Sequence, residues 1–279
     1  MRIGCNTLYT GGGELENTTD FTASLIMDSL ARIRAVGYEA VEFSHAYHLT
    51  PDEARAVGDR ARELGLLPWS VHAEAEGGFI LGDHSDEAAA NLIRCIEVCA
   101  AIGARVVVAH VPIALGLILG ETTSPNVIMR RDLGALRPAL ERAAELDVEI
   151  ALENGRDLDH FKYVLSLLEE LQDDHLGICV DTGHAHLGDL GAPQAIRLAG
   201  SRLLTTHLHD NMGQRDDHMP PATGTINWAD TFAALRQVGY DRVLQLELTD
   251  RPGAREYDQE MEMRWGLENT RLLVAEHLE

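Results

Sequence analysis

A repeated helix–glycine–strand pattern is the feature that most restricts the fold of this chain. Four segments with helical patterning end in glycine, and an apolar, strand-like run follows each: ARIRAVG before YEAVEFS, ARELG before LLPWSVH, CAAIG before ARVVVAHV, and ALRQVG before YDRVLQLEL. Glycine just past a helix favours the left-handed C-cap conformation that turns the chain back. We therefore expect short αβ loops at Gly37, Gly65, Gly103 and Gly239.

Eight strands are predicted between these helices, at 2–7, 39–44, 68–73, 104–111, 148–153, 176–181, 202–209 and 242–248. Several are near-continuous apolar runs, such as ARVVVA, VEIAL and LGICV, as expected when both faces of a parallel sheet are covered. Alternation of this kind predicts an α/β fold, a (β/α)8 TIM barrel, with residues 1–279 forming a single domain. A doubly wound open sheet would give similar local patterns and is the alternative.

The charge of the chain limits its partners. The formal net charge is -22, from 23 Lys+Arg against 45 Asp+Glu, so the average surface field repels phosphate backbones and anionic membranes. We expect neither a nucleic-acid partner nor a membrane partner. Lys162 is the only lysine and lies in a predicted helix, which argues against Schiff-base chemistry.

Cysteine usage and the N-terminal sequence favour a cytoplasmic protein. Cys5, Cys95, Cys99 and Cys179 form no CxxC pair and are expected to be buried, reduced thiols. The N-terminus lacks a basic segment followed by a long apolar stretch, and the longest apolar run, VPIALGLIL, is too short to cross a bilayer. This apolar run could line a pocket, contact a second copy of the chain or simply pack against the rest of the protein, so a homo-oligomer is an open alternative.

Polar side chains recur at the C-terminal ends of predicted strands three to eight, which read SVHAE, VVVAH, IALEN, CVDTGH, THLHD and LQLEL. In a barrel these ends converge on one mouth, where active sites are built. A lone histidine at a strand end is more often structural than functional, but six consecutive strands with such a residue indicate a shared site. The side chains concerned are His72, His110, Glu153, Asp181, His184, His207, His209 and Glu247.

Three of these residues are acids that would be neighbours at the mouth: Glu153, Asp181 and Glu247. Two like charges about 4 Å apart repel by roughly 4 kcal/mol at an effective dielectric constant near 20, so a cation is needed between them. Arginine could supply it in a structural ion-pair cluster. The imidazoles from strands three, four and seven favour a divalent metal instead, because imidazole and carboxylate together suit Mn, Co, Zn or Fe.

The segments ALEN, VDTGH, HLHDN...DDH...GTINW and LELT, in this order and spacing, resemble the xylose-isomerase-like TIM barrels. This family includes sugar isomerases and epimerases, related dehydratases, and endonuclease IV-type enzymes, and the resemblance covers nearly the whole chain. It implies a divalent metal cofactor (Mn, Co, Zn or Mg) on Glu153, Asp181, His207 and Glu247, with His209 as the alternative ligand from strand seven. The family's usual Pro-Gly-x-Gly turn reads Pro221-Ala222-Thr223-Gly224 here.

The endonuclease branch of the family implies further metal ligands at His72, His110, His184, Asp216 and His218. Sugar-acting relatives keep several of these histidines around the substrate, so both a single-metal and a multinuclear site are open. Asp210 and Asp217 are expected only to solvate the loop or form its turns. The long stretch up to Trp228 has room to act as a lid.

The implied chemistry is isomerisation or epimerisation of a sugar, either a ketose or a keto-acid. The metal would chelate the carbonyl oxygen and a neighbouring hydroxyl, acidify the C–H between them and stabilise an enediolate, with Glu153 and Glu247 as base and acid. His184 and His209 would hold substrate hydroxyls, and Arg156 is a candidate substrate contact. The alternatives are a dehydratase of a keto-polyol, an endonuclease IV-like phosphodiester hydrolase with a multinuclear metal site, and a non-catalytic metal-binding barrel. The excess of acid argues against the hydrolase.

Overall fold

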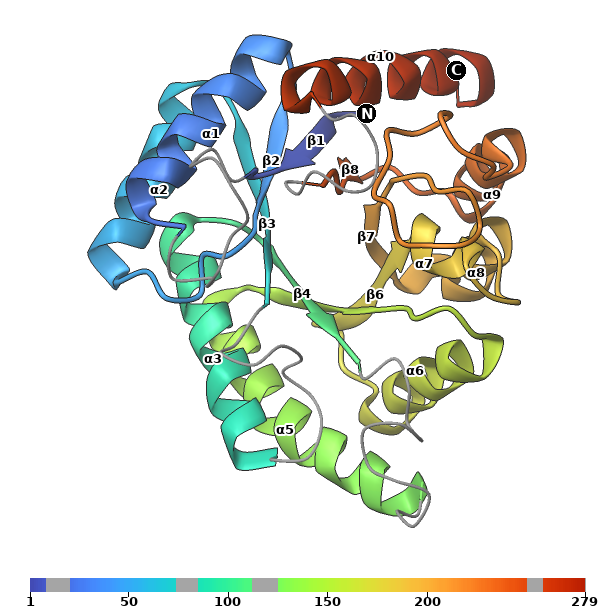
Figure 1. The fold of residues 1–279 in the computed structure, drawn as a ribbon. Helices are drawn as coiled ribbons and strands as arrows, with labels where there is room; N and C mark the ends of the chain where they lie inside the picture. The colour runs from blue at the N-terminus through green and yellow to red at the C-terminus, as the bar shows by residue number, and fades with distance from the viewer. Residues whose placement is uncertain (9–20, 74–84, 112–124, 250–257, 279) are drawn as a thin grey trace.

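Eight parallel strands form a ring surrounded by helices, as Figure 1 shows for the computed structural model. It describes residues 1–8, 21–73, 85–111, 125–249 and 258–278. The strands are β1 (Ile3–Asn6), β2 (Ala40–Phe43), β3 (Leu67–His72), β4 (Val106–His110), β5 (Glu149–Glu153), β6 (Leu176–Asp181), β7 (Leu203–His207) and β8 (Leu244–Leu246). Each lies within or within one residue of its predicted range. The apolar segment VPIALGLIL lies almost wholly outside the described residues.

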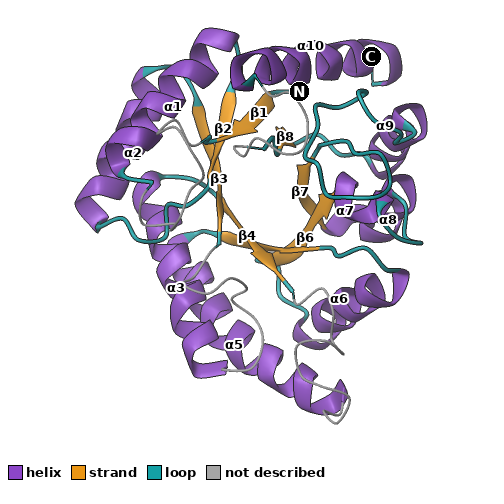
Figure 2. Cartoon of the chain, viewed as in Figure 1, coloured by secondary structure: helices purple, strands orange, loops and turns teal. Residues whose placement is uncertain are grey.

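Closure of the ring distinguishes a barrel from a doubly wound open sheet. The strands are hydrogen-bonded in the order β7-β6-β5-β4-β3-β2-β1-β8. The two end strands meet at a parallel bridge between Leu208 and Leu246, where the Leu208 N–H donates to the Gln245 carbonyl oxygen at 2.9 Å. Figure 2 shows the strands as an orange ring inside the purple helices. The predicted (β/α)8 barrel is therefore confirmed.

The helices cover the outside of the ring, and the predicted glycines follow four of them. They are α1 (Ala23–Val36), α2 (Pro51–Glu63), α3 (Ser85–Ile102), α5 (Pro125–Leu146), α6 (Leu158–Leu171), α7 (Thr182–His186), α8 (Ala192–Ala199), α9 (Trp228–Val238) and α10 (Gln259–His277), with a 3₁₀ turn η2 (Gly200–Arg202). Thr50 and Glu53 form a capping box at the start of α2. The four glycines of the repeated pattern have φ values between 71° and 114°, in the left-handed region. Across the described part of the chain, no helix combines the length and apolar character needed to cross a bilayer.

Two apolar layers position the strand ends. The larger one fills the space between strands and helices, and the smaller one fills the barrel interior with Ala40, Leu67, Trp69, Val106, Val108, Ala151, Cys179, Leu204 and Val243. All four cysteines are buried and free, as expected. Because strand side chains alternate, Glu149 and Glu153 lie on the same face of β5 at its two ends. Glu149 pairs with Arg242 at 2.7 and 2.9 Å and with Arg105 at 3.2 Å.

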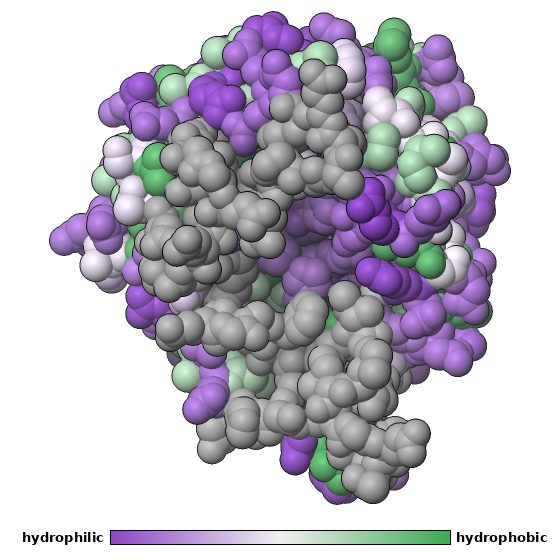
Figure 3. Space-filling model, viewed as in Figure 1, coloured by the Kyte–Doolittle hydropathy of each residue, from purple (hydrophilic) through white to green (hydrophobic). Residues whose placement is uncertain are grey.

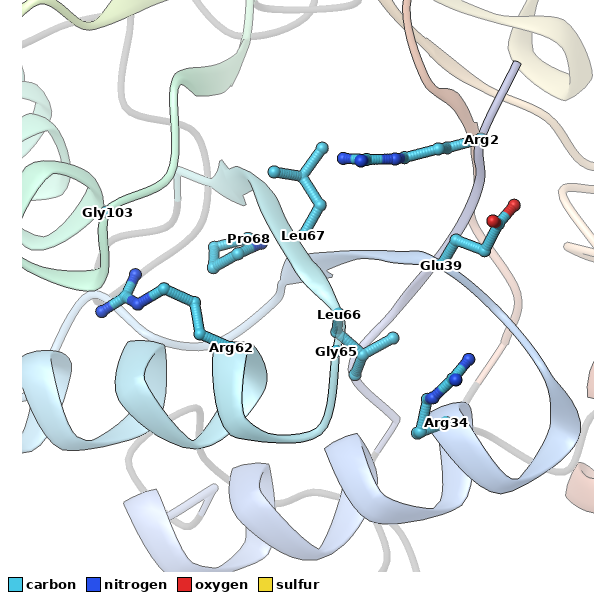
Figure 4. Close-up of a pocket in the computed structure, with 9 residues that line it drawn as sticks. All are labelled: Arg2, Arg34, Glu39, Arg62, Gly65, Leu66, Leu67, Pro68 and Gly103. Carbon is cyan, nitrogen blue, oxygen red and sulfur yellow. The ribbon is translucent and has the colours of Figure 1, made fainter.

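A pocket of about 450 Å³ opens at the N-terminal ends of β1, β2 and β3, and its lining includes Arg2, Arg34 and Arg62. The three arginines do not converge on one point (Figure 4). Arg62 already donates to the Ile102 carbonyl oxygen at 2.8 Å and pairs with Asp59 at 2.7 Å. This pocket lies at the end of the barrel opposite the strand-end acids and contains none of them.

Candidate active site

The C-terminal ends of the strands bring acids and imidazoles together around the mouth of the barrel. Ligand atoms of Glu153, Asp181, His207 and Glu247 all lie within 4.8 Å of one another. The first three are the last residues of β5, β6 and β7, and Glu247 directly follows β8. Parallel pairing aligns His110 with Glu153 and Asp181 with His207. Seen from this side, the molecule has a central hollow lined by hydrophilic residues (Figure 3).

His207 and His209 are the two histidines from β7 and its end, and they face different partners. His207 Nδ1 lies 3.5 Å from Glu153 Oε2, 3.9 Å from Asp181 Oδ2 and 3.4 Å from Glu247 Oε2. His209 Nε2 instead lies 2.9 Å from Asp181 Oδ2. Its ring stacks on His218 with centroids 4.1 Å apart. Of the two, His207 is the one that faces all three acids.

The spacing of these atoms fits a divalent metal. Two ligand atoms that are each about 2.1 Å from one ion lie roughly 3–4 Å apart, which is the spacing found around His207 Nδ1. This nitrogen and both carboxylate oxygens of Glu153 are buried and have no hydrogen bond of good geometry within the described residues. Among the residues that the structure describes, no arginine or lysine forms an ion pair with Glu153, Asp181 or Glu247. The donor set therefore favours a metal over an arginine-neutralised cluster.

Two further imidazoles approach the same acids from β3 and β4. His72 Nε2 lies 3.6 Å from Glu153 Oε2 and 4.0 Å from Glu247 Oε1. His110 Nε2 lies 3.4 Å from Glu153 Oε2. His72, His110 and Glu153 form a second group whose spacing could hold a metal. These histidines reach the site expected from the sequence.

The loop after β7 and helix α7 contribute the remaining polar residues. His184 Nε2 lies 2.9 Å from Asp216 Oδ2, and His184 Nδ1 lies 3.1 Å from Glu153 Oε1. His218 Nδ1 lies 3.5 Å from Glu247 Oε2. Arg156 is exposed and forms no ion pair with these acids within the described residues, so its contact with a substrate stays a prediction.

The electrostatics of the cluster are set by burial and by these close acid–imidazole pairs. Burial disfavours ionised carboxylates, but the neighbouring histidines outweigh it and hold the pKa of Glu153 and of Glu247 well below its usual value. Burial likewise disfavours imidazolium, yet nearby acids raise the pKa of His207 well above its usual value and that of His218 to about 9. His110 differs, because burial dominates and lowers its pKa to about 4. Metal binding to His207 would therefore displace a proton.

Comparison with known proteins identifies the family of this chain. The xylose isomerase-like TIM barrel family matches residues 30–268. The chain belongs to this family.

Proteins similar to this chain include sugar epimerases. A ketose 3-epimerase of Arthrobacter globiformis is 24% identical over 256 residues, which cover 86% of this chain and 81% of that one. An uncharacterized protein of Sinorhizobium fredii is 26% identical over 253 residues, 80% of each chain. The solved structure of an L-ribulose 3-epimerase superposes with a TM-score of 0.77 at 20% identity, covering 99% of this chain and 95% of that one.

Asp210 organises the loop that carries Asp216 and His218, a role that the sequence did not reveal. Its side chain is fully buried. One oxygen accepts from the backbone N–H groups of residues 211 and 226 at 2.9 and 3.1 Å, and the other accepts from the Gly224 N–H at 2.9 Å and Trp228 Nε1 at 2.7 Å. Asp210 thus has a larger structural role than the expected one of solvating the loop or forming a turn. It anchors both ends of the segment that had room for a lid.

Asp217 and Ala222 are two further residues of this loop. Asp217 pairs with Arg215 at 3.2 Å and is partly exposed, in keeping with a solvated position. Ala222 has φ 62°, a left-handed conformation. Glycine adopts this conformation without strain, so the turn is kept at the cost of strain in Ala222.

Glu42 is a further buried acid next to the site, and it was not predicted. It lies in β2 with no exposed surface, and His207 Nε2 approaches its carboxylate at 3.1 Å. The signal was present in the sequence, because an acid inside the short apolar strand AVEF is unusual.

Proposed function

We propose that this chain is a divalent-metal-dependent sugar epimerase or isomerase, which moves a proton at a carbon next to the carbonyl of a ketose or keto-acid. The observation that carries this proposal is the placement of two glutamates from the ends of separate strands, Glu153 and Glu247, at 3.5 and 3.4 Å from His207 Nδ1. Similarity to ketose 3-epimerases supports the choice of substrate class and reaction.

The residues that would hold the metal are Glu153, Asp181, His207 and Glu247. A bound divalent ion supplies Lewis-acid polarisation of a carbonyl oxygen, which makes the adjacent C–H more acidic. Asp181 keeps its orientation because one oxygen accepts from the His184 backbone N–H at 2.6 Å and the other faces His209 Nε2 at 2.9 Å.

Glu153 and Glu247 would move the proton. Both have a pKa well below the usual value and are ionised at neutral pH, so either can accept a proton from carbon. Epimerisation requires removal of a proton from one face of the carbon and delivery of a proton to the other face. One glutamate would accept the first proton, and the other would have to take up a proton from solvent before it delivers one to the opposite face. The Glu247 side chain is 14% exposed and the Glu153 side chain is fully buried, so Glu247 is the more accessible of the two from the mouth.

Histidines around the acids would bind and orient the sugar. His184 Nε2 is held 2.9 Å from Asp216, and His209 stacks on His218. These rings have fixed orientations, which is what positioning of substrate hydroxyls requires. His184 and His209 are the residues that we assign to this task.

The test is hydrogen exchange at the substrate carbon. Protein loaded with Mn²⁺ or Co²⁺ is incubated in D₂O with a panel of free ketopentoses and ketohexoses, and both deuterium incorporation and epimer formation are followed by NMR. We expect Glu153→Gln and Glu247→Gln to abolish exchange while the fold is kept. The matched control is Glu149→Gln, the same change at the other end of β5, which should leave exchange intact. Exchange at wild-type rates in either active-site variant would remove that glutamate from the acid–base pair.

A metal-dependent dehydratase is a close chemical variant, because the same acids could remove a proton and expel water β to a ketone. It would appear in the same NMR experiment as loss of a hydroxyl group from the substrate.

Phosphodiester hydrolysis is the second candidate function. It is favoured by the second group of potential ligands, His72, His110 and Glu153, because two-metal sites stabilise in-line displacement at phosphorus. The net charge of -22 opposes binding to DNA. Metal content per chain and cleavage of abasic-site DNA separate the two functions: one ion without cleavage supports the epimerase, whereas several ions with cleavage would support the hydrolase.

A further inference from the structure

Glu42 forms a contact on the side of His207 that faces away from the acid cluster. The side chains of Glu42 and His207 are fully buried, and His207 Nε2 lies 3.1 Å from both Glu42 carboxylate oxygens. The Ser70 hydroxyl donates to Glu42 Oε2 at 2.7 Å. Strands β2, β3 and β7 thus meet through these three side chains inside the barrel.

This contact determines which nitrogen of His207 carries hydrogen. A carboxylate can only accept hydrogen bonds, so the short approach of Nε2 to Glu42 requires hydrogen on Nε2. In the neutral ring the lone pair is then on Nδ1, the atom that faces Glu153 and Glu247. The ring is further confined by stacking on His72, with centroids 5.6 Å apart and an interplanar angle of 19°.

We propose that Glu42 is a positioning residue for the metal site: it fixes the tautomer and orientation of His207 so that the Nδ1 lone pair points at the divalent ion. This inference rests on the proposed function. Carboxylates that accept from the outer nitrogen of a ligating histidine also increase the basicity of the ring, and their removal weakens metal binding by about 10–100-fold. Ser70 keeps the Glu42 carboxylate in place by donating to Oε2.

The experiment measures binding of Co²⁺ to metal-free protein by calorimetry and by visible absorption of the bound ion. Glu42→Leu removes the acceptor and should raise the Kd for Co²⁺ by about 10–100-fold. Glu42→Gln keeps the shape of the side chain and an oxygen that accepts from Nε2–H, so its Kd should lie between those of wild type and Glu42→Leu. The absorption bands should change in Glu42→Leu, because the His207 ring is no longer held in one orientation.

Glu149→Gln is the matched control, because Glu149 is also a buried strand glutamate but lies at the opposite end of the barrel. It should lower the unfolding temperature and leave the Kd for Co²⁺ unchanged. If Glu42 serves only in packing, the Glu42 variants should likewise have a lower unfolding temperature and an unchanged Kd for Co²⁺. That outcome would overturn the inference.

His207→Ala separates failure of this inference from failure of the proposed function. If His207→Ala binds Co²⁺ as tightly as wild type, the metal site is wrong and the proposed function fails with it. If His207→Ala loses binding while Glu42→Leu keeps the wild-type Kd, only the role of Glu42 is wrong.

Discussion

Substitution of Asp210 by asparagine tests whether the loop after β7 is held by a buried carboxylate. The two carboxylate oxygens accept four N–H donors, two on each oxygen, at 2.7 to 3.1 Å. Asparagine keeps one oxygen, and its NH₂ group must face the other pair of donors. Two donors therefore lose their acceptor in a buried place.

The cost follows from those two donors. A buried donor without a partner costs about 1–3 kcal/mol, so Asp210→Asn should lower the free energy of unfolding by about 2–6 kcal/mol. For a chain of this size, a loss of about 2 kcal/mol corresponds to a decrease of about 4–8 °C in the unfolding temperature. Because Asp216 and His218 are on the same loop, turnover should fall as well, whereas the Kd for Co²⁺ should change little.

Asp217→Asn is the control, since it makes the same chemical change in the same loop at a partly exposed residue paired with Arg215. It should change stability by no more than about 0.5 kcal/mol. Urea unfolding of the metal-free variants, followed by circular dichroism, compares the two. Equal unfolding midpoints for Asp210→Asn and wild type would refute the argument that this carboxylate anchors the loop.

Three further changes test other parts of the structure. Asp132 is buried, and burial outweighs the hydrogen bond from Tyr163 and raises the pKa of Asp132 to about 6. The folded protein therefore loses stability as the pH rises from about 4 to 6. Thermal unfolding scans should show that Asp132→Asn raises the free energy of unfolding by up to about 2–3 kcal/mol at pH 7 but not at pH 4. Ala222→Gly should raise the free energy of unfolding by about 0.5–1 kcal/mol in urea titrations, because glycine adopts φ 62° without strain; a loss of stability would contradict this. In Gly183→Ala the new Cβ would overlap the His209 ring, so the ring must move, at a cost of about 1–3 kcal/mol in stability. We also expect a weaker apparent affinity for the sugar, measured as an increase in KM.

The sequence was sufficient to predict the barrel because its signals are local. Glycine after a helix and apolar runs in strands depend on neighbouring residues, and both survive in the folded chain, as the positive φ angles of Gly37 and Gly239 show. The gathering of the strand-end acids also followed, because parallel strands in a barrel carry their C-terminal ends to one mouth.

The parts that were not predicted depend on contacts between distant residues. Alternation along β7 points both His207 and His209 inward, so the sequence could not decide between them. In the folded chain His207 Nδ1 lies close to both Glu153 and Glu247, which supports our proposal that His207 is the ligand. Asp210 was underestimated because its donors include Gly224 and Trp228, which are far along the loop. Glu42 was missed because its partners, on β3 and β7, are brought to it only by closure of the barrel.

The junction of β7 and β8 gives the proposed ion a mechanical role. These strands share an isolated bridge, and the N–H of Glu247 reaches the Leu208 carbonyl oxygen only at 3.4 Å. His207 is at the end of β7 and Glu247 follows β8. A cation bound by both residues would cross-link the two strand ends where few backbone hydrogen bonds connect them. Metal binding would then reduce local opening between β7 and β8 and slow amide hydrogen exchange there. The supply of metal would therefore affect the stability of the folded chain as well as its chemistry.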